Sequence, residues 1–302
     1  MPINSGNFAK ALWPGVNSWY GQAYAEHGVE YTDLFDKNTS RKAWEEDSGT
    51  SMFGLASVKT EGNGIAYDTA QQGYLKRYQH VTYGLGFNIT KEMVEDDLYD
   101  VIGKKRAQGL AFSMRQTKEV VGADVYNNAF DDSGYPQPDG KAILDTAHPN
   151  IAGGTWDNIT TAASLSEGQL EDLCIDIMQT TNDRGLNIAL IPQTLIVPPD
   201  LVFEADRILN SSLRVGTADN DLNALKNMGK FPGGVKVNHY LTSATAYYIR
   251  TNCPDGAKYF ERRADDFSTD NDFDTENAKY KATGRYSFGV TDARSLFANA
   301  GA

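Results

Sequence analysis

Residues 81–95 read VTYGLGFNITKEMVE. In the first nine of them, every second position is apolar and the positions between carry threonine, glycine or asparagine. This alternation predicts a β-strand over 81–89 with one apolar face. At about 3.3 Å per residue the strand spans about 30 Å, and an isolated pair of such strands is only marginally stable. A neighbouring element must therefore cover its apolar face.

A long helix is predicted directly after this strand. Thr90 can cap it, acidic residues crowd its first turns, and basic residues follow at 104–106, which suits the helix dipole. Apolar residues keep a helical spacing to about Asn128. A helix over 90–128 would be roughly 55–60 Å long. Three glycines inside it mark places for a bend or a break: Gly103, Gly109 and Gly122.

Residues 151–253 carry the pattern of an α/β block. Ser166 with Gln169 three residues later is a capping-box pattern that predicts the start of a helix. A buried strand is predicted over 188–197, and Pro198-Pro199-Asp200 begins a further helix. Short strands are expected at 235–240 and 246–250.

Two extended runs near the C-terminus, 258–262 and 279–290, are predicted to pair with each other across an acidic loop. Long strands, a long helix and an α/β block together indicate an α+β fold.

The segments before the strand at 81–89 differ in character. The first 40 residues place aromatic side chains among glycine, asparagine and proline without a sustained period, which predicts an irregular arm lying on another surface. Residues 49–73 are rich in small polar residues, and Glu61-Gly62-Asn63-Gly64 predicts a turn at a flexible hairpin tip. We expect neither the arm nor the hairpin to bury its apolar side chains within a compact monomer, so other chains should cover them.

The charge balance excludes several classes of partner. The chain has 302 residues, 28 Lys plus Arg against 40 Asp plus Glu, and a formal net charge of −12. An acidic surface does not neutralise phosphates, so direct nucleic-acid binding and anionic membranes are disfavoured. No apolar run approaches the roughly 18–20 residues of a membrane span, and no secretory signal is recognisable. Cys174 and Cys253 predict reduced structural thiols of a cytoplasmic protein.

The motifs of common enzyme classes are missing. The sequence contains no GxxxxGK[ST], no HExxH and no GxSxG. The calcium-loop spacing of Asp270, Asp272 and Asp274 lacks the glycine and the bidentate glutamate of such loops, so a solvated acidic loop is favoured, with weak divalent binding left open. Asp145 and His148 could orient an imidazole for acid–base work, but a structural hydrogen bond is favoured. No catalytic, cofactor or metal-binding residue is therefore predicted.

The order of elements resembles the major capsid proteins of tailed phages with the HK97 fold, and it is most similar to the Mu-like major head subunit family. Five stretches carry the resemblance, and their shared order matters more than any one of them: FNITKE at 87–92, DDL at 96–98, LDTAHP at 144–149, LIVPPDL at 195–201 and RYSFGVTDAR at 285–294.

This resemblance implies an HK97-like division of the chain. The implied regions are an N-terminal arm at 1–38, an extended E-loop hairpin at 39–88, a P-domain at 89–150 with the long spine helix, an α/β A-domain at 151–253, and the P-domain strands at 254–302.

The resemblance also implies a function without catalysis. The chain would assemble as pentamers and hexamers into an icosahedral shell that encloses double-stranded DNA without sequence-specific binding, formed in the host bacterial cytoplasm. A portal protein, a separate scaffolding protein and a decoration protein are the implied partners. The expected assembly-interface residues are aromatic or apolar: Trp13, Trp19, Tyr83, Leu85 and Phe87. Lys59 and Asn63 stand near the loop tip, but an isopeptide crosslink between subunits is not expected.

Two alternatives stay open at this point. One is a cellular nanocompartment shell of the same fold, which would enclose a cargo enzyme. The other is an unrelated acidic enzyme or carbohydrate-binding protein that uses Trp44 and Trp156 with His148.

Overall fold

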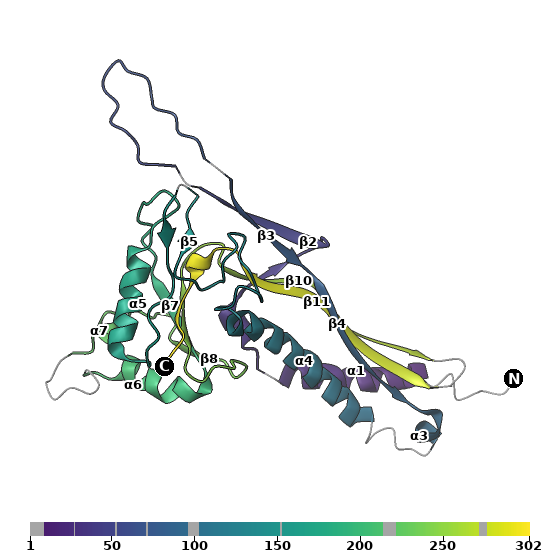
Figure 1. The fold of residues 1–302 in the computed structure, drawn as a ribbon. Helices are drawn as coiled ribbons and strands as arrows, with labels where there is room; N and C mark the ends of the chain where they lie inside the picture. Colours follow the sequence, from purple (N-terminus) through teal and green to yellow (C-terminus); the bar gives the residue numbers. More distant parts are fainter. Residues whose placement is uncertain are drawn as a thin grey trace.

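The computed structural model describes residues 9–26, 28–51, 53–70, 72–95, 103–151, 153–213, 222–271 and 277–302. Two four-stranded sheets organise these residues, and each sheet carries its own helices (Figure 1). The helices are α1 (Ala9–Glu26), α2 (Tyr31–Leu34), α3 (Lys91–Glu95), α4 (Lys104–Asn127), α5 (Glu167–Gln179), α6 (Val202–Asn210) and α7 (Ala224–Asn227), with 3-10 turns η3 (Pro199–Leu201) and η4 (Ala293–Ser295).

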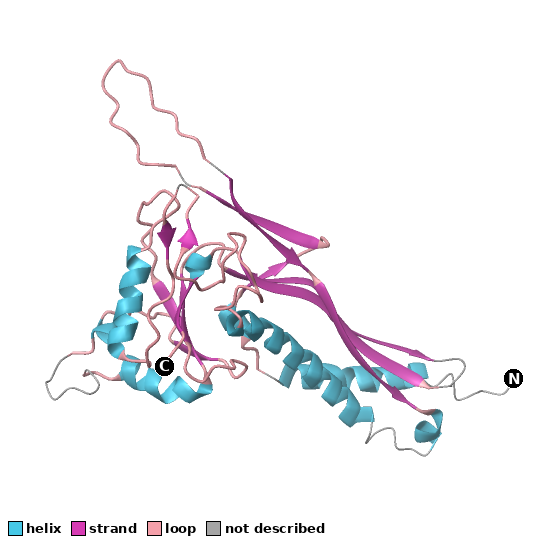
Figure 2. Ribbon diagram, viewed as in Figure 1, coloured by secondary structure: helices cyan, strands magenta, loops and turns pink. Residues whose placement is uncertain are grey.

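The first sheet is long and has one covered face. Its strand order is β1 (Asp36–Thr39), β10 (Ala257–Asn271), β11 (Ala278–Val290) and β4 (Val81–Ile89), with β1 parallel to β10 and the other pairs antiparallel. Helices α1 and α4 run along this sheet (Figure 2). The apolar residues between them form one cluster, which includes Tyr20, Ala23, Leu110, Met114, Phe267, Tyr280 and Ala282.

The second sheet forms the α/β unit. Its order is β12 (Leu296–Asn299), β9 (Tyr247–Thr251), β7 (Pro192–Val197) and β8 (Val235–Val237). Alternate residues of β9 face opposite sides: Tyr247 and Ile249 pack with α5, α6 and α7, whereas Tyr248 packs toward α4. The sheet is therefore buried on both faces, as its continuous apolar runs require.

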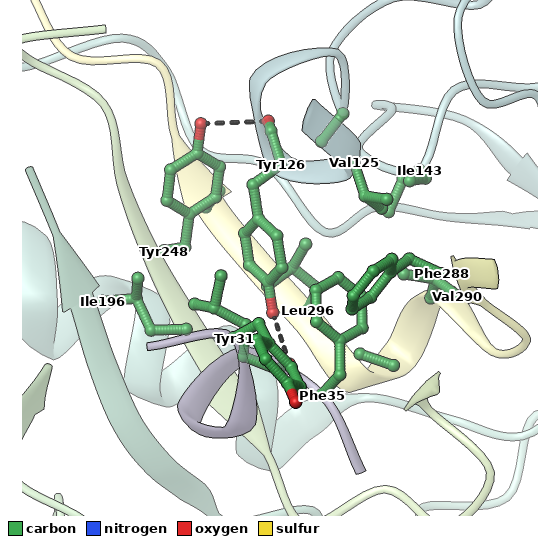
Figure 3. Packing of buried hydrophobic residues seen from close by; sticks show 14 of the residues in the cluster. Tyr31, Phe35, Val125, Tyr126, Ile143, Ile196, Tyr248, Phe288, Val290 and Leu296 are labelled. Atoms are coloured by element: carbon green, nitrogen blue, oxygen red, sulfur yellow. Dashed lines mark hydrogen bonds between the residues drawn. The ribbon is translucent and has the colours of Figure 1, made fainter. Parts of the chain in front are cut away.

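A shared core joins the α/β unit to the long sheet (Figure 3). The hydroxyl of Tyr126, at the end of α4, donates a hydrogen bond of 2.9 Å to the Leu34 carbonyl, and the Tyr248 hydroxyl donates one of 3.2 Å to the Tyr126 carbonyl. Tyr31 and Phe288 meet nearby with ring centroids 5.8 Å apart. The buried hydroxyls of Tyr126 and Tyr248 therefore both donate hydrogen bonds, while their rings pack in the apolar cluster. Together these contacts fix the two units against each other.

A two-stranded ribbon leaves this body. It consists of β2 (Trp44–Thr50) and β3 (Gln72–Gln79), and the connection between them projects away from both sheets (Figure 1). The predicted turn is confirmed, because Gly62 has a φ of +85°, which glycine adopts without strain, and Asn63 N–H donates to the Thr60 carbonyl. A short pair, β5 (His148–Pro149) and β6 (Thr155–Trp156), lies on the α/β unit.

Several sequence predictions are confirmed. The strand over 81–89 is β4 with the same bounds. Ser166 caps α5 and accepts a hydrogen bond from the Gln169 amide at 3.4 Å. The two C-terminal runs pair antiparallel as β10 and β11.

The N-terminal prediction was wrong in two respects. Residues 9–26 form a helix rather than an irregular arm, and Tyr20 and Ala23 are buried against the chain's own α4. Pro14 and two glycines, Gly15 and Gly21, disfavour a helix in isolation, but packing on α4 outweighs that local preference. The arm therefore hides part of its apolar surface without another chain.

One predicted element is described only in part, and another is longer than expected. The helix predicted over 90–128 corresponds to α3 and α4, and residues 96–102 between them lie outside the described part of the chain. The strand predicted at 258–262 continues as β10 to Asn271, because β11 pairs with it over most of that length.

The implied division of the chain crosses the observed sheets. Strand β4, from the range 39–88, pairs with β11, and β12, from the range 254–302, lies in the sheet of the α/β unit. The five ranges that the resemblance implied therefore stay a prediction about which part of the chain takes which role in an assembled shell.

Candidate assembly interface

Strand β4 carries three of the five expected interface residues. It is the edge strand of the long sheet. Tyr83 stacks on Tyr286 with ring centroids 4.8 Å apart, and Phe87 stacks on Tyr280 at 5.0 Å. These two side chains are half-buried in the subunit's own core, whereas Leu85 between them is 52% exposed. The interface role is thus best suited to Leu85.

The two expected tryptophans both lie on α1. Trp19 is half-buried and packs against the cluster between α1, α4 and the long sheet. The side chain of Trp13 lies outside the described part of the structure. Trp19 and Phe87, two of the five expected residues, pack against the same apolar cluster.

The connection between β2 and β3 exposes a set of apolar side chains, as the sequence analysis expected of the hairpin without naming the residues. Val58 is 92% exposed and Tyr67 is 95% exposed, which is unusual for side chains of this size. They lie in an extended segment without regular structure that stands clear of the body (Figure 2). The whole set is Phe53, Leu55, Val58, Ile65 and Tyr67. Grouped apolar exposure of this kind marks a surface that another molecule covers.

The base of this connection is held by the α/β unit. Arg184 Nη1 lies 2.8 Å from Asp68 Oδ2, and its Nη2 donates a 2.5 Å hydrogen bond to the Thr69 carbonyl. The Gly54 amide donates to the same carboxylate at 2.8 Å. The backbone amides of Gly54 and Thr69, and then Arg184, hold the pKa of the Asp68 carboxyl below its usual range. The ribbon therefore leaves the body in a defined direction.

A buried ionic group fixes α1 and α4 to the long sheet. Lys118 Nζ, on α4, lies 3.0 Å from Asp265 Oδ2 on β10, and the two side chains are 2% and 4% exposed. The Tyr24 hydroxyl of α1 donates to the same Asp265 oxygen, and Lys118 Nζ also donates to the Tyr24 oxygen at 3.3 Å. Burial, with Asp265 alongside, raises the pKa of Tyr24. The hydroxyl therefore stays protonated as a donor.

His148 does not form an acid–base site with Asp145. Its Nδ1 lies 2.8 Å from Asp139 Oδ2 instead, and Asp145 accepts a hydrogen bond from the Ala147 amide. The His148 side chain is 1% exposed, so no substrate reaches it. Although burial opposes ionisation of Asp139, the hydrogen bond from His148 holds the pKa of that carboxyl below its usual range. The cluster stabilises the turn, as the sequence analysis favoured.

Trp156 offers no free ring face for a sugar. Its ring stacks on His148 with centroids 4.6 Å apart, and the Arg294 guanidinium lies 4.5 Å from its centroid. Trp44 is exposed, with Arg77 over its ring at 5.2 Å. The carbohydrate-binding alternative therefore loses Trp156, one of its proposed residues.

Metal and membrane sites find no support among the described residues. Of the calcium-loop candidates only Asp270 is described, and Asp272 and Asp274 lie outside that part of the chain. No cluster of three or more metal-ligating side chains occurs where the structure is described. Both cysteines are free thiols. Within the same residues, no helix has the length and apolarity to cross a membrane.

His80 links the ribbon to the long sheet and is buried. Its Nδ1 lies 2.9 Å from Ser287 Oγ and its Nε2 lies 3.1 Å from Ser40 Oγ. Burial, and then the positive charge of Arg285, holds the pKa of His80 below its usual range. The folded subunit therefore prefers the neutral imidazole.

We expect His80 to make the subunit less stable in acid. Because the folded pKa is lowered, the unfolded chain binds the proton first, so the stabilisation is complete above about pH 6.5 and is lost as the pH falls toward the folded value. Chemical denaturation of the wild-type subunit and of His80→Gln between pH 7 and pH 5 checks this. The wild type should lose more unfolding free energy than the variant, and parallel profiles would contradict the prediction.

Comparison with known proteins identifies the family. The sequence profile of the phage capsid protein family matches residues 74–299. No curated protein matches the chain. A similar solved structure comes from Mycobacterium phage Adephagia, with 11% sequence identity, 90% of each chain covered and a TM-score of 0.54. Another comes from Mycobacterium phage Che8, with 12% identity, 91% of this chain and 93% of that chain covered, and a TM-score of 0.52. The structure of a virus-like particle from Pyrococcus furiosus is also similar, with 10% sequence identity, 94% of this chain and 97% of that chain covered, and a TM-score of 0.51.

These structural similarities, all at low sequence identity, concern the fold. They confirm the α+β, HK97-like fold that the sequence resemblance implied. The family match covers most of the chain and includes both sheets except for β1. The chain therefore belongs to the phage capsid protein family, and it is a structural subunit of the virion capsid rather than an enzyme.

Proposed function

We propose that this chain is a major head subunit of the Mu-like type, which forms pentamers and hexamers around packaged double-stranded DNA. The observation that carries the proposal is the exposed apolar set of the β2–β3 connection, from Phe53 to Tyr67, which the subunit does not cover itself. An adjacent subunit of a closed shell would supply that cover in every position.

The implied regions then take distinct roles in the shell. Residues 1–38 would be the arm, 39–88 the E-loop that lies over an adjacent subunit, and 151–253 the A-domain at the fivefold and sixfold axes. The remaining ranges, 89–150 and 254–302, would form the P-domain near the threefold axes. The projecting ribbon and the separate α/β unit support this arrangement.

A portal protein, a separate scaffolding protein and a decoration protein are the proposed partners. Repulsion between subunits of charge −12 favours a scaffold that brings them together before the shell closes. Electron microscopy of the expressed chain, alone and with the proteins of the same phage, tests the function. Closed shells with fivefold and sixfold capsomers support it, and closed uniform shells from the purified chain alone would contradict the scaffold.

Assembly should depend on ionic strength. At about 0.01 M salt the screening length is about 30 Å, so neighbouring acidic subunits repel one another, and at about 0.15 M it falls to about 8 Å. We expect the yield of shells to rise between these concentrations, measured by sedimentation. An unchanged yield would show that the net charge does not oppose assembly.

A further inference from the structure

Three arginines line a recess on the long sheet. Arg262 and Arg263 of β10, Arg285 of β11 and Thr82 of β4 surround a space of about 240 Å³. Neighbouring residues of β11, including Tyr286, are buried toward α4, so Arg285 points to the opposite face of the sheet. The recess therefore opens on the face that α1 and α4 leave uncovered.

Irregular strand pairing builds this recess. Consecutive residues of a regular strand point to opposite faces. Here the register of β10 on β11 shifts between Glu261 and Arg263 and again between Arg263 and Asp266. Both Arg262 and Arg263 consequently line the same space. Bulges of this kind often re-aim side chains next to functional sites.

The arrangement places like charges together. Arg263 is directly opposite Arg285 in the ladder, and like charges in that position destabilise a sheet. Arg285 is in turn opposite Thr82, so no acidic residue alternates with the two arginines along this row. A subunit with an excess of acidic residues nevertheless collects three cations here.

No acidic side chain among the described residues neutralises these charges through an ion pair. Arg263 Nη2 donates to Thr283 Oγ1 at 2.8 Å, and Arg285 Nε donates to the His80 carbonyl at 3.2 Å, both neutral acceptors. Arg262 Nε is buried and has no hydrogen-bond partner in the described part of the structure. Among the described residues none of the three arginines forms an ion pair, although Arg77, Arg184, Arg207, Arg250 and Arg294 all do.

We propose that the recess of Arg262, Arg263 and Arg285 binds a carboxylate side chain of a second copy of this chain in the shell. Guanidinium groups in a fork match a carboxylate with paired hydrogen bonds. The surface of any other copy is rich in carboxylates, since Asp and Glu exceed Lys and Arg by 40 to 28. The pair supplies local attraction between subunits whose net charges repel.

Packaged DNA suits the recess less well than a protein carboxylate. The rest of the chain has a large acidic excess, so a duplex backbone that reached three arginines would also meet a repulsive surface. A single carboxylate needs only the recess itself. The proposal rests on the chain's self-association, so wild-type shell formation under the same conditions separates a failure of this site from a failure of assembly.

The test compares two charge reversals on the same face of the sheet. Arg263→Glu changes the recess, and Lys281→Glu makes the same change in charge at an exposed position of β11 outside it. Shells and free subunits are separated by sedimentation. We expect Arg263→Glu to reduce shells about tenfold or more, as the loss of one charge-assisted contact implies, and Lys281→Glu to change them less than about twofold.

Three outcomes would overturn the proposal. Equal losses in both variants would point to general charge repulsion, and wild-type assembly of Arg263→Glu would show that no carboxylate binds there. Normal shell numbers with less enclosed DNA would assign the recess to nucleic acid. If Arg263→Glu fails to fold, Arg263→Gln decides, because it removes the repulsion from Arg285. Its free subunit should be at least as stable as the wild type while its shells decrease, and unchanged assembly would refute the site.

Discussion

Replacing Lys118 with alanine should destabilise the free subunit by about 3–5 kcal/mol, the cost of leaving one member of a buried ion pair without its partner. The variant leaves the Asp265 carboxylate, whose side chain is 4% exposed, without its ion-pair partner. It also removes the hydrogen bond that Lys118 donates to the Tyr24 hydroxyl. Because this group joins α1, α4 and β10, helix α1 should loosen before the core of the α/β unit. Chemical denaturation measures the free energy of unfolding. Hydrogen exchange shows whether α1 opens before the core of the α/β unit.

The matched control is Lys105→Ala, the same substitution at an exposed position of the same helix. It should change the unfolding free energy by less than about 0.5 kcal/mol. The double variant Lys118→Ala with Asp265→Asn should recover part of the loss, because the buried charge that remained is then neutral. A loss in Lys118→Ala no larger than in Lys105→Ala would show that the ionic group does not hold the helices.

The sequence predicts the fold best where local pattern and final environment agree. Strand β4 has one face on the core and one face away from it, so its alternating residues give its bounds directly. Helix α1 could not be found in this way, since Pro14 and Gly21 disfavour it locally and the surface that stabilises it, on α4, is distant in the chain. The far half of β10 is rich in charged residues and becomes a strand only through its pairing with β11.

The candidate interface was only partly predictable for a related reason. The apolar residues from Phe53 to Tyr67 are spaced irregularly among small polar residues, so the sequence predicted an uncovered hairpin without identifying which side chains it exposes. The arginine recess depends on strand register, which brings Arg263 opposite Arg285. Conversely, Tyr83 and Phe87 match the interface pattern but stack on tyrosines of β11. Sequence alternation marks an apolar face without telling which chain covers it.

A substitution at Leu85 tests whether this face of β4 is covered by the subunit's own core or by a neighbouring subunit. Leu85→Asp should leave the subunit folded and abolish most of the assembly. The side chain is 52% exposed on an edge strand, so an aspartate there meets water in the free subunit. In a shell that covers the strand, the variant loses a buried leucine and buries a charge, which costs about 2 kcal/mol or more at each contact, or about thirtyfold in affinity. Sedimentation measures the shells, and circular dichroism of the free subunit measures its fold.

Two further variants of β4 serve as controls for Leu85→Asp. Asn88→Asp adds the same charge to the same strand on its other face, where we expect far smaller effects on assembly. Phe87→Asp should instead lower the stability of the free subunit, because Phe87 stacks on Tyr280 within the core. If Leu85→Asp unfolds the subunit, Leu85 belongs to the monomer core. If the variant folds and assembles as the wild type does, no neighbouring subunit covers this face of β4.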